Sequence, residues 1–151
     1  AGAIPEPAVP LEAPFGDQLR LRGYTVNPFP GGPRPGGTLP ITLFWEPLVD
    51  LADTDYAVFV HLTTPDDPRP LAQTDGLPME GGLPTSRWTE PFAQLHDDRT
   101  ILLPADLAPG TYVLRMGVYH AADGQRLPAT APATTVLDDA VVLGEVQILQ
   151  P

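Results

Sequence analysis

The sequence contains no cysteine, and every cation in it is an arginine. Without cysteine the chain cannot form disulfides, thiolate metal sites or a cysteine nucleophile. The same absence assigns no compartment, because many exported bacterial proteins also lack cysteine.

Lysine is missing as well, and positive charge is scarce. Eight arginines stand against nineteen acidic residues, for a formal net charge of −11. An acidic chain without a basic patch is a poor ligand for nucleic acids and for anionic membranes, because phosphate contacts supply most of that affinity. We therefore expect no nucleic-acid partner. The acidity favours a role in solubility over the binding of cationic ligands.

Long apolar runs are also absent. No stretch approaches the roughly 18–20 residues of a membrane span, so no direct membrane insertion is expected. The first residues lack the charged and apolar regions of an intact signal peptide, which favours a mature form or a piece of a longer protein. Residues 1–16 are rich in proline and alanine and predict an extended linker. Residues 17–151 are then expected to form one domain.

Alternation of apolar and polar residues with a period of two is the main pattern present. It predicts strands over 17–26, 38–47, 56–65, 98–104, 110–120 and 140–149, a short one over 71–74 and a return strand at 125–128. Asp66, Asp67, Asp97 and Asp98 are predicted turn residues. No amphipathic helix is evident. Seven or eight strands with turn signals between them indicate an all-β protein with an antiparallel β-sandwich of the immunoglobulin or fibronectin type III kind.

The stretch "DLAPGTY", residues 106–112, has a structural interpretation. Leu107 would close the end of the core, and Pro109–Gly110 would make a turn. The Tyr112 hydroxyl would reach back to a backbone carbonyl, as in the tyrosine corner of immunoglobulin-like sandwiches. The stretch resembles the "L-x-P-G-T-x-Y" pattern of fibronectin type III domains. Trp45 shares a strand face with Ile41 and is predicted to lie in the core.

A broader resemblance covers residues 16–149. The succession "GDQLRLRGYTV", "GGTLPITLFWEPL", "DYAVFVHL", "LAQTDGLPMEGGLPTSRW", "LAPGTYVLRMGVYHAADGQRLP" and "VVLGEVQI" resembles bacterial β-sandwich domains at the C-terminal end of membrane proteins similar to dolichyl-phosphate-mannose–protein mannosyltransferases. The resemblance implies an upstream membrane domain in the same chain. It also implies an extracytoplasmic, membrane-tethered location. It carries no catalytic residues.

Residues for catalysis are few. Ser86 is the only serine and does not lie in a nucleophile elbow. A glycosidase needs two carboxyls across a cleft, and the sequence places no such pair. His61, His96 and His120 lack the spacing of a helical zinc motif. His61 lies in the middle of a strand beside Phe59, so a buried or half-buried histidine with satisfied hydrogen bonds is favoured over a metal ligand. His120 is expected to be solvated. No enzyme activity and no cofactor are predicted.

The one candidate metal site is weak. Asp50, Asp53 and Asp55 lie close together in a loop, and hard oxygen ligands at this density could hold calcium. The stretch lacks the glycine and the distal glutamate of an EF-hand loop. A solvated acidic loop is therefore favoured over a metal site.

The segment 76–96 has no clear period and is long for a loop, so it either holds a short strand or is functional. Within it, Ser86, Arg87 and Trp88 form the candidate ligand site. An exposed Trp88 could stack on a sugar while the two polar neighbours bond its hydroxyls. The alternative, which is favoured, is a buried Trp88 that closes one end of the sandwich.

The resemblance implies a non-catalytic accessory domain of a membrane glycosyltransferase-like protein, and the predicted role of this domain is to bind or position a glycan. The alternative is a structural spacer or a protein-interaction module. A glycosidase-type enzyme is the third hypothesis.

Overall fold

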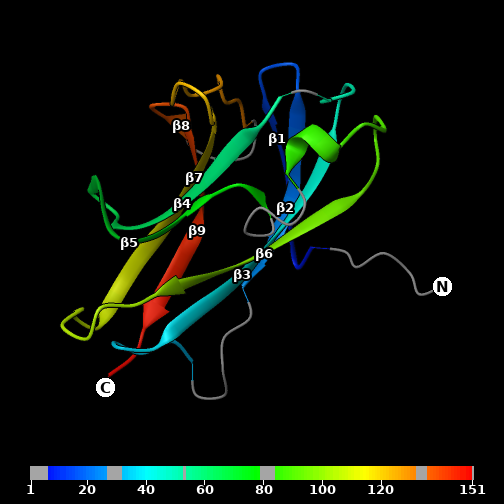
Figure 1. Cartoon of the computed structure of the whole chain (residues 1–151). Coiled ribbons are helices and arrows are strands. Elements are labelled where there is room, and N and C mark those ends of the chain that lie inside the picture. Colours follow the sequence, from blue (N-terminus) through cyan, green and yellow to red (C-terminus); the bar gives the residue numbers. More distant parts are fainter. Residues whose placement is uncertain (1–6, 27–31, 53, 79–83, 132–135, 151) are drawn as a thin grey trace.

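A computed structural model of the chain describes residues 7–26, 32–52, 54–78, 84–131 and 136–150, most of which lie in two antiparallel β-sheets. The sheets face each other as the two layers of a sandwich (Figure 1). Within the described ranges there is no α-helix, and no helical segment is long and apolar enough for a membrane crossing. The prediction of an all-β antiparallel sandwich is confirmed.

One sheet has four strands and the other has five. The first runs in the order β1 (Val9–Phe15), β2 (Leu19–Val26), β3 (Thr38–Pro47) and β6 (Leu95–Leu102). The second runs in the order β5 (Asp67–Gly76), β4 (Tyr56–Thr64), β7 (Gly110–His120), β9 (Ala140–Ile148) and β8 (Val136–Leu137). The two sheets together have nine strands in the described residues, which is more than the seven or eight expected. The predicted return strand at 125–128 is reduced to an isolated bridge between Tyr119 and Arg126.

The interpretation of residues 1–16 as a linker is wrong for β1. This strand pairs antiparallel with β2, and its side chains Leu11, Ala13 and Phe15 are buried in the core. Prolines are tolerated there because β1 is an edge strand, where a missing N–H interrupts no ladder on the free side. The pairing of β1 with β2 is irregular, because its register shifts between Pro10 and Ala13. The sandwich therefore includes residues 9–15.

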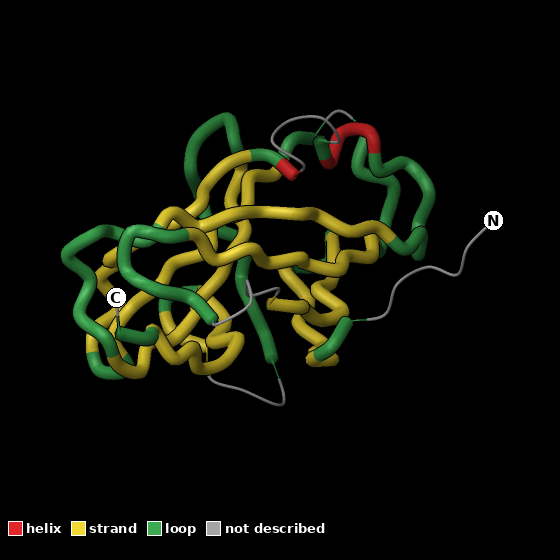
Figure 2. Tube along the Cα trace, turned by 90° about the horizontal axis from the view of Figure 1, so that it is seen from below, coloured by secondary structure: helices red, strands yellow, loops and turns green. Residues whose placement is uncertain are grey.

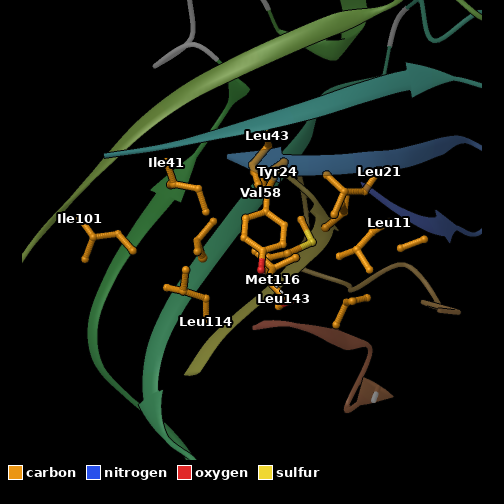
Figure 3. Close-up of a cluster of buried hydrophobic side chains, with 14 of the residues drawn as sticks. Leu11, Leu21, Tyr24, Ile41, Leu43, Val58, Ile101, Leu114, Met116 and Leu143 are labelled. Carbon is orange, nitrogen blue, oxygen red and sulfur yellow. Dashed lines mark hydrogen bonds between the residues drawn. The ribbon is translucent and has the colours of Figure 1, made fainter. Parts of the chain in front are cut away.

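The core lies between the two sheets and is made of alternate residues from their inner faces (Figure 3). Full burial of a leucine or isoleucine side chain contributes about 1.5–3 kcal/mol, so this layer dominates stability. Tyr24 of β2 crosses the layer and donates a 2.9 Å hydrogen bond to the carbonyl of Leu143 in β9. A Cβ on Gly144 would lie 2.4 Å from the Tyr24 hydroxyl oxygen, so a larger residue at this position would displace that hydroxyl.

The tyrosine corner is confirmed. The Tyr112 hydroxyl donates to the Ala108 carbonyl at 2.5 Å, and Leu107 is buried at the same end of the core. Pro109 and Gly110 lie between the two, directly before and at the start of β7. This stretch is structural, as predicted.

An ion pair lies buried between the sheets, at the side where the edge strands β5 and β6 approach each other. The Arg99 Nε donates to the Asp97 carboxylate at 2.6 Å, and both side chains are almost fully buried. The two remaining nitrogens of Arg99 donate to the carbonyls of Val58 and Gly76, each at 2.8 Å. The prediction of a turn at Asp97–Asp98 is wrong, because β6 already begins at Leu95.

Candidate functional site

Trp88, the predicted sugar platform, is buried. Its exposed fraction is 2%, and its ring centroid lies 6.3 Å from that of Trp45, which is itself fully buried. A sugar cannot stack on a ring whose faces are covered by the core. The platform hypothesis is therefore wrong, and the alternative interpretation of Trp88 as a buried residue is confirmed.

The segment around Trp88 is held against one end of the sandwich by a short 3-10 helix, η2 (Thr85–Arg87; the red turn at the upper right of Figure 2). The Thr85 hydroxyl accepts a hydrogen bond from the Tyr56 amide and donates to the Thr54 carbonyl, both at 2.8 Å. The Leu51 amide donates to the Trp88 carbonyl at 3.0 Å. These bonds direct the tryptophan inward, because both ends of the turn are tied to the loop before β4.

The two polar residues beside Trp88 do not complete a ligand site with it. Arg87 is exposed, whereas the Ser86 amide donates to the Asp55 carboxylate at 3.3 Å. With Trp88 in the core, the three predicted residues do not share an accessible surface.

The acidic loop gives no support to a metal site. One carboxylate oxygen of Asp50 accepts from the Ala52 amide at 2.8 Å, and Asp55 bonds Ser86 as described. Asp53 lies outside the described residues. In the part of the chain that the structure describes, no three His, Asp or Glu side chains are grouped to hold an ion.

The outer face of the five-stranded sheet carries a second cluster of side chains. Strands β4 and β7 are neighbours, and their register sets Phe59 opposite Gly117 and His61 opposite Arg115. A Cβ on Gly117 would lie 2.4 Å from the Phe59 ring, so the missing side chain makes room for that ring. The Arg126 guanidinium lies over the same ring, 4.5 Å from its centroid. Phe59 is thus only 3% exposed although it points away from the core.

These residues form the floor of a pocket of about 330 Å³. Its walls come from the start of β5 and from the chain around β8. The lining residues are Phe59, His61, Asp67, Pro68, Arg69, Pro70, Arg115, Arg126, Leu137, Asp138 and Ala140. A second depression, of about 380 Å³, shares Pro68, Arg115 and Leu137 with it. Arg115 thus reaches both hollows of this face.

Arg115 is 8% exposed, and its hydrogen-bond partners among the described residues are neutral oxygens. Its Nε donates to the Thr63 hydroxyl at 3.0 Å, and its Nη2 donates to the Pro65 carbonyl at 3.3 Å. No carboxylate of the described residues lies within 4.0 Å of it. Arg126 is likewise held by a carbonyl, that of Asp138, at 2.8 Å. The pocket therefore presents guanidinium charge that no ion pair within the described chain neutralises.

Two titratable groups beside the pocket have shifted pKa values. Burial lowers the pKa of His61, the positive charge of Arg126 lowers it further, and Asp75 opposes both. His61 is half-buried, as predicted, and its ring centroid lies 4.5 Å from that of Phe59. Burial, together with the hydrogen bond that its hydroxyl donates to Asp75, raises the pKa of Tyr119 to about 12. Both groups are therefore neutral at pH 7.

Sequence reasoning missed this pocket, although part of the signal was present. The alternation that sets Tyr112, Leu114 and Met116 on the core face sets Arg115 on the opposite face of the same strand. A charged residue within an otherwise apolar strand is the signal that could have been used. The sequence does not show that β4 lies beside β7, and that contact is what joins His61 to Arg115.

No known family model matches the chain, and no curated protein matches it. Several solved structures share the fold, including the following two. One is a Niemann-Pick type C2 protein from Japanese carpenter ant, with 9% sequence identity, a TM-score of 0.52, and coverage of 92% of this chain and 98% of that one. The other is the C-terminal domain of wzt, with 14% identity, a TM-score of 0.51, and coverage of 97% of this chain and 82% of that one. The fold is thus an immunoglobulin-like β-sandwich, as predicted.

Proposed function

We propose that this chain is a non-catalytic accessory domain that binds a glycan on the outer face of its five-stranded sheet. The observation that carries the proposal is the pocket in which buried Arg115 lies beside Phe59 and His61. Its volume of about 330 Å³ is at the lower end of the range for ligand pockets, which fits a single sugar residue. Guanidinium groups fork onto paired oxygens, and sugars present such oxygens.

A binding role, rather than a catalytic one, is favoured by the chemistry of the lining. Arginine stays protonated in proteins and cannot act as a general base. Tyr119, with a pKa of about 12, also keeps its proton near neutral pH. Asp67 lines the pocket, and its carboxylate accepts a hydrogen bond from the Arg69 amide at 3.0 Å. These groups suit the recognition of a ligand better than proton transfer to it.

The proposal includes the setting that the sequence resemblance implies. The domain would be extracytoplasmic and tethered to an upstream membrane domain of a glycosyltransferase-like protein. A shallow pocket binds a single sugar weakly, and tethering offsets this by raising the effective concentration of the site. The test is the full reading frame with a topology reporter at its C-terminus. A free-standing chain with no membrane part would contradict this setting.

Glycan binding itself is tested with a glycan array and a ¹H–¹⁵N NMR titration of the chain. We expect shifts at Gly117, His61 and Arg126, and none at Arg87 in η2. Trp88→Ala serves as a comparison, and it should lower the melting temperature because it empties part of the core. An array without signal, together with unchanged spectra, would favour the spacer or interaction module.

A further inference from the structure

The positive charge of the molecule is concentrated at the outer pocket. The chain has eight arginines and a net charge of −11, and three of the eight, Arg69, Arg115 and Arg126, line this one pocket. In the part of the chain that the structure describes, none of the three lies within 4.0 Å of a carboxylate. By contrast, Arg20 pairs with Glu46 at 2.9 Å and Arg99 with Asp97 at 2.6 Å.

The lining is positive even when its acids are counted. Three guanidinium groups stand against the carboxylates of Asp67 and Asp138, which leaves a charge of +1 with His61 neutral. A positive hollow on a strongly acidic molecule is a local reversal of sign, and such a hollow attracts anions from solution.

Arg115 is a buried charge that has no counterion among the described residues. Burying a charge costs free energy unless the charge is paired, and neutral hydrogen-bond acceptors compensate only part of that cost. Thr63 and Pro65 accept from Nε and Nη2, and neither acceptor carries a negative charge. An oxyanion in the pocket would supply the negatively charged partner that Arg115 lacks among the described residues, since carboxylates and phosphates accept two parallel bonds from a guanidinium.

Arg126 is held so that it can act beside Arg115. Its Nη1 is bonded to the Asp138 carbonyl, and the plane of the Phe59 ring supports its guanidinium carbon at 4.5 Å. A cation over an aromatic ring keeps its charge and gains orientation. Two oriented guanidinium groups on one pocket of about 330 Å³ form a site for an anionic group.

We infer that the ligand is a sugar that carries an oxyanion, either a carboxylate or a phosphate, and that Arg115 and Arg126 bind this group. The inference rests on the glycan-binding function proposed above. Arg115 is the buried anchor, and Arg126 closes over the anion from the exposed side. The shared chemistry is the planar or tetrahedral oxyanion, which comes from a uronic acid or from a sugar phosphate.

The experiment is a titration followed by calorimetry and by ¹H–¹⁵N NMR with four probes: methyl glucuronide, a hexose phosphate, methyl glucoside and inorganic phosphate. The variants are Arg115→Gln and Arg126→Gln. Arg87→Gln is the matched control, because it removes the same charge from an exposed position in η2 outside the pocket. If Arg115→Gln fails to fold, the exposed Arg126→Gln carries the test.

We expect at least one anionic sugar to bind roughly tenfold or more tightly than methyl glucoside. Its affinity should fall about tenfold in Arg115→Gln and Arg126→Gln and stay unchanged in Arg87→Gln. It should also weaken severalfold between about 0.05 and about 0.5 M salt. The tighter of the two anionic sugars identifies the source of the oxyanion.

The other outcomes separate the inference from the function on which it rests. Equal binding of methyl glucoside and the charged sugars, insensitive to Arg115→Gln, would overturn the inference and leave glycan binding in place. Inorganic phosphate that binds as well as the sugars would support the anion site and overturn the glycan function. Binding lost only in Arg87→Gln, or no binding of any probe, would overturn the inference.

Discussion

Two arginines are buried in the described part of this protein, and their surroundings differ. Arg99 lies between the sheets, with the Asp97 carboxylate at 2.6 Å and two backbone carbonyls at 2.8 Å. Arg115 lies on the outer face of the five-stranded sheet, where a hydroxyl and a carbonyl are its bonded partners.

The difference indicates what each residue is for. Arg99 is neutralised within the protein and links strands β4, β5 and β6, so it contributes to the stability of the fold. Arg115 is nearly as deeply buried but lines two hollows and lacks a carboxylate neighbour within the described residues. A buried charge without an internal counterion is costly, and such costs are typical of functional sites. Changes at Arg99 should therefore alter stability, and changes at Arg115 should alter binding.

The largest effect is expected from Arg99→Met. The substitution leaves the Asp97 carboxylate buried without its cation, which costs about 3–5 kcal/mol of unfolding free energy. Urea unfolding followed by tryptophan fluorescence measures this loss. The double variant Asp97→Leu/Arg99→Met should recover most of it, because an apolar pair replaces the ion pair. If Arg99→Met is as stable as the wild type, the ion pair does not contribute to the free energy of unfolding.

A neutral, partly buried hydrogen bond should contribute less to stability than the buried ion pair. Tyr112→Phe removes the hydrogen bond to the Ala108 carbonyl and should cost about 1 kcal/mol. The expected loss of unfolding free energy is small because Ala108 is exposed, so water can replace the lost bond to its carbonyl. The same unfolding measurement tests this, and a loss as large as that of Arg99→Met would remove the distinction between the two kinds of bond.

On the outer face, Arg115→Met should change the unfolding free energy by no more than about 1 kcal/mol. The lost bonds are offset by removal of a buried charge, and the Thr63 hydroxyl keeps its bond to the Thr64 carbonyl at 2.9 Å. Urea unfolding of this variant beside Arg99→Met compares the two arginines directly. A loss of several kcal/mol would make Arg115 a structural residue like Arg99.

The smallest effect concerns His61 and pH. Because burial and Arg126 lower its pKa in the folded state, the unfolded chain takes up a proton near pH 6.5 that the folded chain accepts only at lower pH. The stability contributed by neutral His61 is complete above pH 6.5 and is lost as the pH falls from there to the folded pKa. The groups that face His61 include Arg115 across the strand pair, Arg126 and Asp75.

An NMR titration of the His61 ring measures this pKa, and His61→Gln is the control. The stability of the variant should fall less than that of the wild type between about pH 7.5 and pH 5. A His61 ring that titrates at or above pH 6.5 would contradict the prediction.

Strand patterns were the most predictable part of the molecule. The alternation over 38–47 and 110–120 matches β3 and β7, because each strand has a core face and period-two patterning reports it. β1 was missed because its prolines indicate a linker, and their tolerance depends on an edge position that only the assembled sheet defines. The start of β6 was missed because Asp97 and Asp98 are typical of turns.

The sequence by itself determined that this protein is an antiparallel sandwich with a tyrosine corner, since these follow from local patterning and turn chemistry. It also determined the scarcity of positive charge. Only the tertiary structure decided that Trp88 is covered by Trp45, that Asp97 meets Arg99 between the sheets, and that Arg115 lies beside His61 and Arg126 in one pocket. The physical reason is that burial and charge compensation depend on which strands become neighbours, and local pattern does not specify that choice.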